Sequence, residues 1–205
     1  RDWSSDVCSS DLYSVFAQDE IRWNQWTFLP GLRYDQTRLE PHATDEFLRA
    51  VGGASDPINL DEKKWHRVSP KFGVTYAFND NYTWYGQYAE GFRTPTAKAL
   101  YGRFENPGQG YSVQGNPNLE PEKSKSYETG LRGNFDAGNF DVAVFYNKYR
   151  DFINEDAVKG TNIGLDFEAN NIKHATIKGA EFKGRLNLDH FGAPSGLYTQ
   201  GSLAY

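Results

Sequence analysis

Residues 71–78 read KFGVTYAF, in which an apolar side chain occupies every second position from Phe72 to Phe78. This period of two is typical of a β-strand with one apolar face and one polar face. The residues that follow, Asn79–Asn81, are of the types that form tight turns. The stretch therefore predicts a strand at about residues 65–78 that ends in a short turn.

The same period recurs along the chain. We expect eight strands, at about residues 13–24, 26–38, 65–78, 82–92, 124–135, 140–151, 175–188 and from 197 onward. In the strand predicted at residues 175–188, Ile177 and Lys178 are expected on opposite faces. Two of the predicted strands, 26–38 and 140–151, repeat the separation of apolar and polar side chains seen at 71–78.

The connections between these strands alternate in length. The short ones are at residues 24–25, 79–81, 136–139 and 189–195, and the long ones, at 39–64, 93–123 and 152–174, are rich in Gly, Pro, Asn and charge. Short turns at one end and long loops at the other are typical of an outer-membrane barrel, whereas a soluble β-sandwich has shorter strands. We expect an all-β, antiparallel transmembrane β-barrel. The long loops indicate an arc of a larger barrel, of about 22 strands.

Composition agrees with this interpretation. The chain has 205 residues, of which 38% are hydrophobic and 16% aromatic, with a net charge of -5. The aromatic content excludes a disordered chain, and no run approaches the 18 apolar residues of a membrane-spanning helix. The negative charge argues against nucleic acid as a partner. A barrel strand can be polar at every second position, because only one face meets lipid.

Alternation assigns side chains to the two faces. We expect Phe72, Val74, Tyr76, Phe140, Val142 and Val144 to face lipid. We expect a hydrated inner wall made of Glu20, Arg22, Arg33, Asp35, Lys71, Glu128 and Arg132. Aromatic residues near the strand ends suit the membrane interfaces, although ordinary strand aromatics explain each of them nearly as well. These are Trp23, Trp26, Trp65, Tyr82 and Tyr149.

The first twelve residues read RDWSSDVCSSDL and show neither strand alternation nor the apolar core of a signal peptide. They resemble a translated sequencing adapter, so we exclude residues 1–12 from the predicted domain. A native polar loop is the alternative. The segment contains Cys8, the only cysteine, so the rest of the chain can form neither a disulfide nor a thiolate metal site. Residues 13–205 are predicted to be part of a barrel whose remaining strands and plug lie outside this fragment.

Six motifs resemble the TonB-dependent outer-membrane receptors, and they occur in the right order along residues 13–205. They lie at residues 18–20, 30–35, 69–73, 88–96, 116–122 and 145–153. The resemblance implies an active transporter of the outer membrane. In such a receptor the TonB complex of the inner membrane drives rearrangement of a plug inside the barrel.

Two of these motifs are similar to the paired boxes that flank the haem-binding loop of haem and haemoglobin receptors. The first box is Phe92, Arg93, Thr94 and Pro95, and the second is Asn116, Pro117, Asn118 and Leu119. Siderophore receptors carry looser versions of both. A purely structural interpretation is also open, because proline ends a strand and Asn-Pro-Asn favours a turn.

The loop between the boxes contains no histidine, since the four histidines are at positions 42, 66, 174 and 190. Tyrosinate is an alternative haem-iron ligand. Tyr111 follows Gly108-Gln109-Gly110 on what we expect to be a flexible tip, and it resembles the loop tyrosine of tyrosine-ligating receptors. Tyr101 is a second candidate, for which packing under the loop is the favoured alternative, and His42 is a more distant one. The plug is expected to supply the other axial ligand.

The resemblance favours a receptor for haem or haemoproteins, with a ferric-siderophore receptor as the alternative. A passive porin or a barrel enzyme represents a different class. The phosphate-binding, nucleophile-elbow and zinc motifs of common enzymes are absent from the sequence. We therefore expect no enzyme activity and no intrinsic cofactor. The expected partners are the TonB complex, haem or a haemoprotein, and outer-membrane lipid.

Overall fold

The computed structural model describes residues 8–42, 60–106, 108–155, 157–160 and 165–205. Its elements are β1 (Cys8–Gln18), β2 (Ile21–Trp23), β3 (Trp26–Pro41), β4 (Lys63–Ala77), β5 (Tyr82–Arg93), α3 (Ala97–Tyr101), β6 (Arg103–Asn106), β7 (Tyr111–Gln114), β8 (Glu122–Phe135), β9 (Gly138–Asn154), β10 (Val158–Gly160), β11 (Leu165–Glu168), β12 (Asn170–Asn187), η1 (Leu188–Phe191) and β13 (Tyr198–Ala204). Within these ranges, no helix has the length and hydrophobicity needed to cross a membrane.

The long strands form one antiparallel sheet in the order β1-β3-β4-β5-β8-β9-β12-β13, with β2 also paired to β3. Neighbours in the sheet are neighbours in the sequence, as the predicted strand-turn-strand pattern requires. The sheet does not close, since β1 and β13 lie at its two edges. The prediction of a partial antiparallel barrel is thus confirmed, whereas the strand number of the complete barrel stays a prediction.

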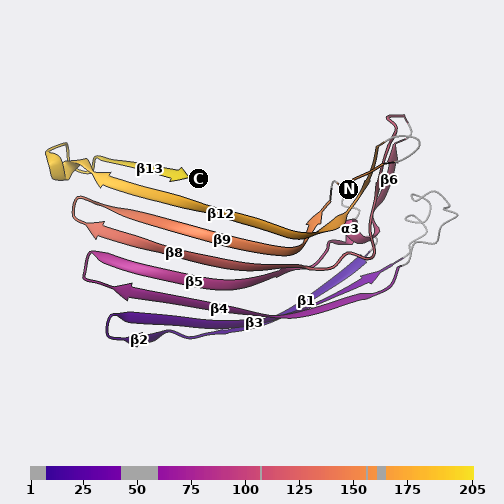
Figure 1. The fold of residues 1–205 in the computed structure, drawn as a ribbon, viewed down its shortest axis with the longest axis horizontal. Coiled ribbons are helices and arrows are strands. Elements are labelled where there is room, and N and C mark those ends of the chain that lie inside the picture. The colour runs from indigo at the N-terminus through magenta and orange to yellow at the C-terminus, as the bar shows by residue number, and fades with distance from the viewer. Residues whose placement is uncertain (1–7, 43–59, 107, 156, 161–164) are drawn as a thin grey trace.

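Turns and loops segregate to opposite ends of the strands, as Figure 1 shows. The β2–β3, β4–β5, β8–β9 and β12–β13 connections lie at one end, which we call the turn end. Asn24 takes a positive φ of 51° in the first of these turns, and Gly138 a φ of 147° in the third. The helix α3 and strand β6 lie at the other end, the loop end. The predicted alternation of short and long connections is confirmed.

The first long strand differs from the prediction at its start and in its middle. We expected it to begin at Tyr13, but β1 begins at Cys8, which pairs with Pro41 of β3. The prediction was wrong because the ladder is made by backbone groups and does not need side-chain alternation. The strand is interrupted at residues 19–20, opposite Pro30, which has no N–H to donate. The adapter origin of residues 1–12 stays a prediction.

The register places the two predicted sets of side chains on opposite faces of the sheet. Val74 pairs with Gly86, Gly86 with Thr129, and Thr129 with Val144, so these residues share one face. All six residues predicted to face lipid lie on this apolar face. Arg33, Asp35, Lys71, Glu128 and Arg132 lie on the other, polar face. The predicted segregation is confirmed for these residues and for Arg22, which pairs with Thr27 on the polar face, whereas Glu20 lies between β1 and β2.

Basic side chains also occur on the apolar face, and β12 gives one example. In β12, Lys178 pairs with Tyr146 and therefore lies on the apolar face, whereas Ile177 pairs with Asn147 on the polar face. Ile177 and Lys178 lie on opposite faces, as the sequence indicates, but the lysine is on the apolar face. Both side chains are exposed.

Polar-face side chains form local networks along the strands. The Arg132 guanidinium donates from Nε to Asp141 Oδ2 at 2.8 Å and lies 4.3 Å from the centre of the Tyr85 ring. Arg33 donates in the same way to Asp35 at 2.8 Å. These contacts agree with the predicted hydrogen-bonded wall.

The apolar core of the described residues lies at the loop end rather than within the sheet. Cys8, Leu39, Ala99, Leu100, Tyr101, Leu119, Ile153 and Ala169 make one buried cluster. A single sheet buries little between its own strands, so side chains become buried where loops fold over the strand ends. The cluster joins β1, β3, α3 and β9 to the loop segments between them.

Candidate functional site

The first box ends a strand and starts a helix. Phe92 and Arg93 are the last two residues of β5, and the buried Pro95 follows. Thr96 then caps α3, because its Oγ1 accepts a hydrogen bond from the Ala99 N–H at 3.1 Å. The structural role expected of Pro95 is consistent with this geometry.

The second box is a turn that anchors the returning chain. The Asn116 side chain accepts from the Asn118 N–H at 2.9 Å and donates from Nδ2 to the Ala169 carbonyl at 3.0 Å. Such a side-chain turn is common for asparagine. Leu119, the last residue of the box, is buried in the loop-end cluster.

Contacts that flank the two boxes close the base of the loop into a stem. The Asn116 N–H donates to the Ala99 carbonyl at 2.8 Å, and the Gly115 N–H donates to the Gly102 carbonyl at 2.6 Å. Arg93 pairs with Glu122 in the sheet, and its Nε lies 3.0 Å from Glu122 Oε2. The stem fixes where the loop at residues 96–115 begins and ends.

Glu122 also supports the backbone of the neighbouring strand. Its Oε1 accepts from the Ile153 N–H at 2.7 Å, and both residues are buried. Glu122→Ala should cost about 1–3 kcal/mol of unfolding free energy, because it leaves a buried N–H without an acceptor. Glu122→Gln, which keeps the acceptor, should cost much less, and so should Arg93→Gln, since Arg93 is largely exposed. Denaturant unfolding of the full-length protein measures all three, and equal losses for Gln and Ala would contradict the assignment.

Tyr101 is enclosed in the core under the loop. Only 2% of its surface is exposed, and its hydroxyl donates to the Asp61 carbonyl at 2.7 Å. Burial raises the pKa of Tyr101 to about 12, so the phenol stays protonated near neutral pH. These contacts favour the packing role over iron ligation.

Tyr111 occupies the first position of β7. It follows Gly110, whose φ is 67°, and its backbone is aligned with Asn106 of β6 and with Leu165 of β11. The side chain is half-buried. Tyr111 thus lies in a strand that is paired on both sides, directly after the glycine-rich turn at residues 108–110, and the flexibility of that tip stays a prediction.

A second sheet explains this order. Strands β6 and β7 from the loop at 93–123 and strands β10 and β11 from the loop at 152–174 form a sheet in the order β10-β11-β7-β6. The β11–β7 pair is parallel, so two different loops are joined through their backbones. Sequence reasoning missed this sheet, since its strands have at most four residues and no clear period.

Asn171 is another residue that the sequence did not single out. It accepts from the Glu120 N–H at 2.8 Å and donates to the carbonyls of Glu120 and Asp151, at 2.9 and 2.6 Å. These bonds tie the start of β12 to the segment after the second box. No sequence signal distinguishes it from the other loop asparagines.

The histidines lie in separate places. His42 directly follows β3, is exposed, and has its Nε2 3.2 Å from Ser9 Oγ. His66 and His174 are in β4 and β12, whereas His190 is in η1 at the turn end. Over the ranges that the structure covers, no three His, Cys, Asp or Glu side chains gather as metal ligands.

Comparison with known families agrees with this geometry. The sequence model described as TonB dependent receptor-like, beta-barrel, matches residues 2–205. The chain belongs to this family of TonB-dependent receptor β-barrels.

Two relatives of the receptor chain are named for haemoglobin. The Hemoglobin-haptoglobin utilization protein B of Neisseria meningitidis serogroup C is 28% identical over 96% of this chain. The Probable hemoglobin and hemoglobin-haptoglobin-binding protein 4 of Haemophilus influenzae is 33% identical over 80% of it. The alignments cover 25% and 17% of these proteins, so the receptor chain spans a quarter or less of their length.

Solved structures share the fold of the receptor chain. The Copper transporter OprC matches 97% of the chain with a TM-score of 0.75 and 20% identity, over 29% of its own length. The hemophore receptor HasR of Serratia marcescens, in complex with its hemophore HasA and heme, matches 96% with a TM-score of 0.71 and 19% identity, over 34% of its own length. At these identities the likeness concerns the fold alone.

Proposed function

We propose that the receptor to which this chain belongs takes up haem, free or carried by a haemoprotein, across the bacterial outer membrane with energy from the TonB complex. The observation that carries this proposal is the similarity to two proteins named for haemoglobin and haptoglobin, along 96% and 80% of the chain. The role is transport rather than catalysis.

The two faces of the sheet support the membrane placement. A closed barrel satisfies every backbone group internally, so its apolar face can contact lipid while its polar face lines the lumen. The polar face carries the Arg132–Asp141 and Arg33–Asp35 pairs, which suit a hydrated wall around a plug. The plug and the surface that contacts TonB belong to other parts of the full-length receptor in this proposal.

Tyr111 is the iron ligand that we propose on this chain. Its backbone is aligned with strands on both sides, β6 and β11, and these strands come from two different loops. A ligand held in this way pays less ordering entropy when it binds than one on a mobile tip. The tyrosinate oxygen is a known axial ligand of haem iron. The second axial ligand is proposed to come from the plug.

Tyr101 and His42 have lesser roles in this proposal. The Tyr101 phenol is buried and hydrogen-bonded, so we assign it to holding α3 against Asp61. His42 is exposed at the end of β3, beside Ser9. The two boxes act as the stem that positions the loop strands.

Absorbance titration of the full-length receptor with haem, beside a ferric siderophore and with uptake measured with and without TonB, tests the function. We expect saturable haem binding with a tyrosinate-type spectrum and uptake that stops without TonB. If the receptor binds the ferric siderophore but not haem, the protein is a ferric-siderophore receptor and the haem proposal is wrong. Uptake that continues without TonB would indicate a passive porin.

A further inference from the structure

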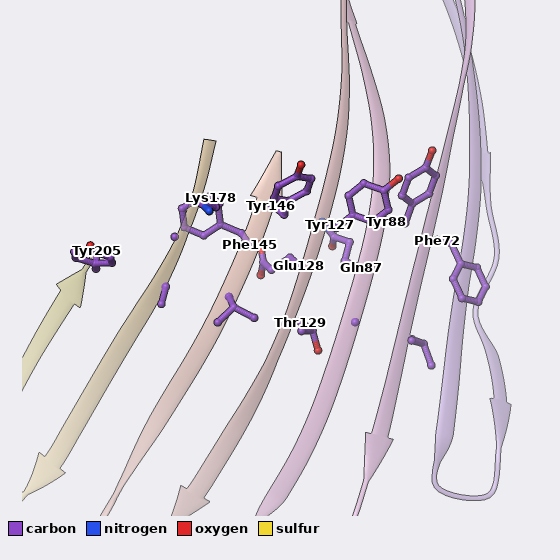
Figure 2. A pocket seen from close by; sticks show the side chains of 15 residues that line it. Phe72, Gln87, Tyr88, Tyr127, Glu128, Thr129, Phe145, Tyr146, Lys178 and Tyr205 are labelled. Carbon is purple, nitrogen blue, oxygen red and sulfur yellow. The ribbon is translucent and has the colours of Figure 1, made fainter. Parts of the chain in front are cut away.

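A row of tyrosines crosses the apolar face about midway along the strands. Tyr88 pairs with Tyr127, and Tyr127 with Tyr146, with ring centres 5.1 and 6.5 Å apart. Figure 2 shows their hydroxyl groups pointing toward the loop end, with Phe72 and Lys178 on the flanking strands. Tyrosines with this arrangement are typical of a membrane–water interface, because the ring packs in lipid and the hydroxyl stays hydrated.

Basic side chains cover the same face from this row toward the loops. In the sheet Lys125 pairs with Lys148, Lys123 with Arg150, and Lys178 with Tyr146. Residues two positions apart in a strand share a face, so these side chains lie on the face of Tyr127 and Tyr146. We call this set the basic patch, made of Lys123, Lys125, Lys148, Arg150 and Lys178.

The charge of the basic patch is only partly balanced. Lys125 Nζ lies 3.1 Å from Glu90 Oε1, and Lys123 Nζ lies 3.9 Å from Asp151 Oδ2. Among the residues that the structure describes, Lys148, Arg150 and Lys178 have no carboxylate within ion-pair distance. Like charges directly opposite each other in a sheet are destabilising, and Glu90 offsets this for Lys125, which faces Lys148 in the neighbouring strand.

The position of the basic patch indicates which anions it can meet. It begins at the tyrosine row, on the face that meets lipid in the proposed barrel, where phosphate-bearing headgroups lie. Ammonium and guanidinium groups bind phosphate through charge-assisted hydrogen bonds. A plug inside the barrel would contact the opposite, polar face and cannot reach the basic patch.

We infer that the basic patch binds the phosphate groups of anionic lipids in the leaflet around the loop end. This inference rests on the outer-membrane placement in the proposed function but not on the identity of the cargo. The geometry specifies a headgroup with more than one phosphate, since the cations come from three neighbouring strands, β8, β9 and β12.

The test compares two triple variants of the full-length receptor with the wild type in phosphatidylcholine nanodiscs containing lipid A. The patch variant is Lys148→Gln, Arg150→Gln and Lys178→Gln. The matched control is Lys71→Gln, Lys173→Gln and Lys183→Gln, which removes three charges from the polar face. Thermal unfolding establishes that both variants are folded before lipid retention is measured.

The wild type should retain lipid A in preference to its dephosphorylated form. The patch variant should bind lipid A about a hundredfold more weakly than the wild type, because each of its three lost cations contributes about fivefold near a phosphate surface. The control should lose little affinity. Unchanged retention in the patch variant, equal loss in the control, or equal retention of dephosphorylated lipid would each overturn the inference. So would a patch variant that keeps lipid but loses haemoglobin capture, which would indicate a protein-docking surface.

Haem titration of the same samples separates this inference from the proposed function. A receptor that retains lipid A through the basic patch but binds no haem would remove the proposed cargo and leave the lipid site. A receptor that binds haem but retains lipid A and its dephosphorylated form equally would remove the lipid site and leave the proposed cargo.

Discussion

Tyr111→Phe should lower the affinity of the full-length receptor for haem by at least about a hundredfold. Loss of a group that merely supports a ligand costs 10–100-fold, and the substitution removes the ligand oxygen itself. The ring is retained, and the backbone alignment with β6 and β11 does not involve the hydroxyl. The tyrosinate band of the haem complex should disappear from the absorbance spectrum.

Tyr101→Phe is the control for this experiment. It removes the hydrogen bond to the Asp61 carbonyl, which should cost about 1 kcal/mol of stability, while haem affinity stays close to the wild-type value. His42→Ala should also leave the spectrum unchanged. If Tyr111→Phe binds haem as the wild type does, Tyr111 is not the ligand. If Tyr101→Phe alone loses the band, the loop must open on binding to expose the buried phenol.

The strands could be predicted because each has a physical signal in its own residues. Period-two alternation and the turn residues between strands located all eight, including β4 from residues 71–78 alone. The interruption opposite Pro30 and the extension of β1 back to Cys8 could not be predicted in this way. Both depend on hydrogen bonds with another strand, and the side chains of the segment do not report them.

The candidate site was predictable only in part, for a related reason. The boxes were found as motifs, but the contacts that close the stem, such as the Asn116 N–H with the Ala99 carbonyl of α3, are made by backbone groups. The parallel pairing of β7 with β11 joins residues from two loops that are far apart in the sequence. In the sequence alone, the glycine-rich tip at residues 108–110 therefore looked flexible. In the structure, β11 pairs with β7, the strand that begins at Tyr111.

The position of Lys178 shows how register adds what alternation leaves undecided. Alternation opposes Ile177 to Lys178 but does not say which of them shares a face with Val144. The pairing of Lys178 with Tyr146 decides it and places a cation beside the tyrosine row. The basic patch is thus a property of three strands in register, and no single strand reveals it.

Val144→Arg should cost about 1–2 kcal/mol of unfolding free energy in a lipid bilayer, because Val144 lies two residues from the tyrosine row, between the midplane, where a cation on the lipid face costs about 2–4 kcal/mol, and the interface, where it costs about 0–1 kcal/mol. Val144 is on the apolar face, half-exposed, and opposite Thr129 and Ala180, so no carboxylate stands directly across from it in either neighbouring strand. Denaturant unfolding of the full-length receptor in vesicles measures the loss.

Two further variants decide whether lipid contact is the cause. Asn147→Arg puts the same side chain on the polar face of the same strand, where water and the wall charges solvate it, and should cost less than about 1 kcal/mol. Val144→Leu keeps the site apolar and should be nearly neutral. A Val144→Arg protein as stable as Asn147→Arg would mean that the apolar face does not meet hydrocarbon. The membrane placement, and with it the lipid site at the basic patch, would then have to be abandoned, since both require that this face be the outer one.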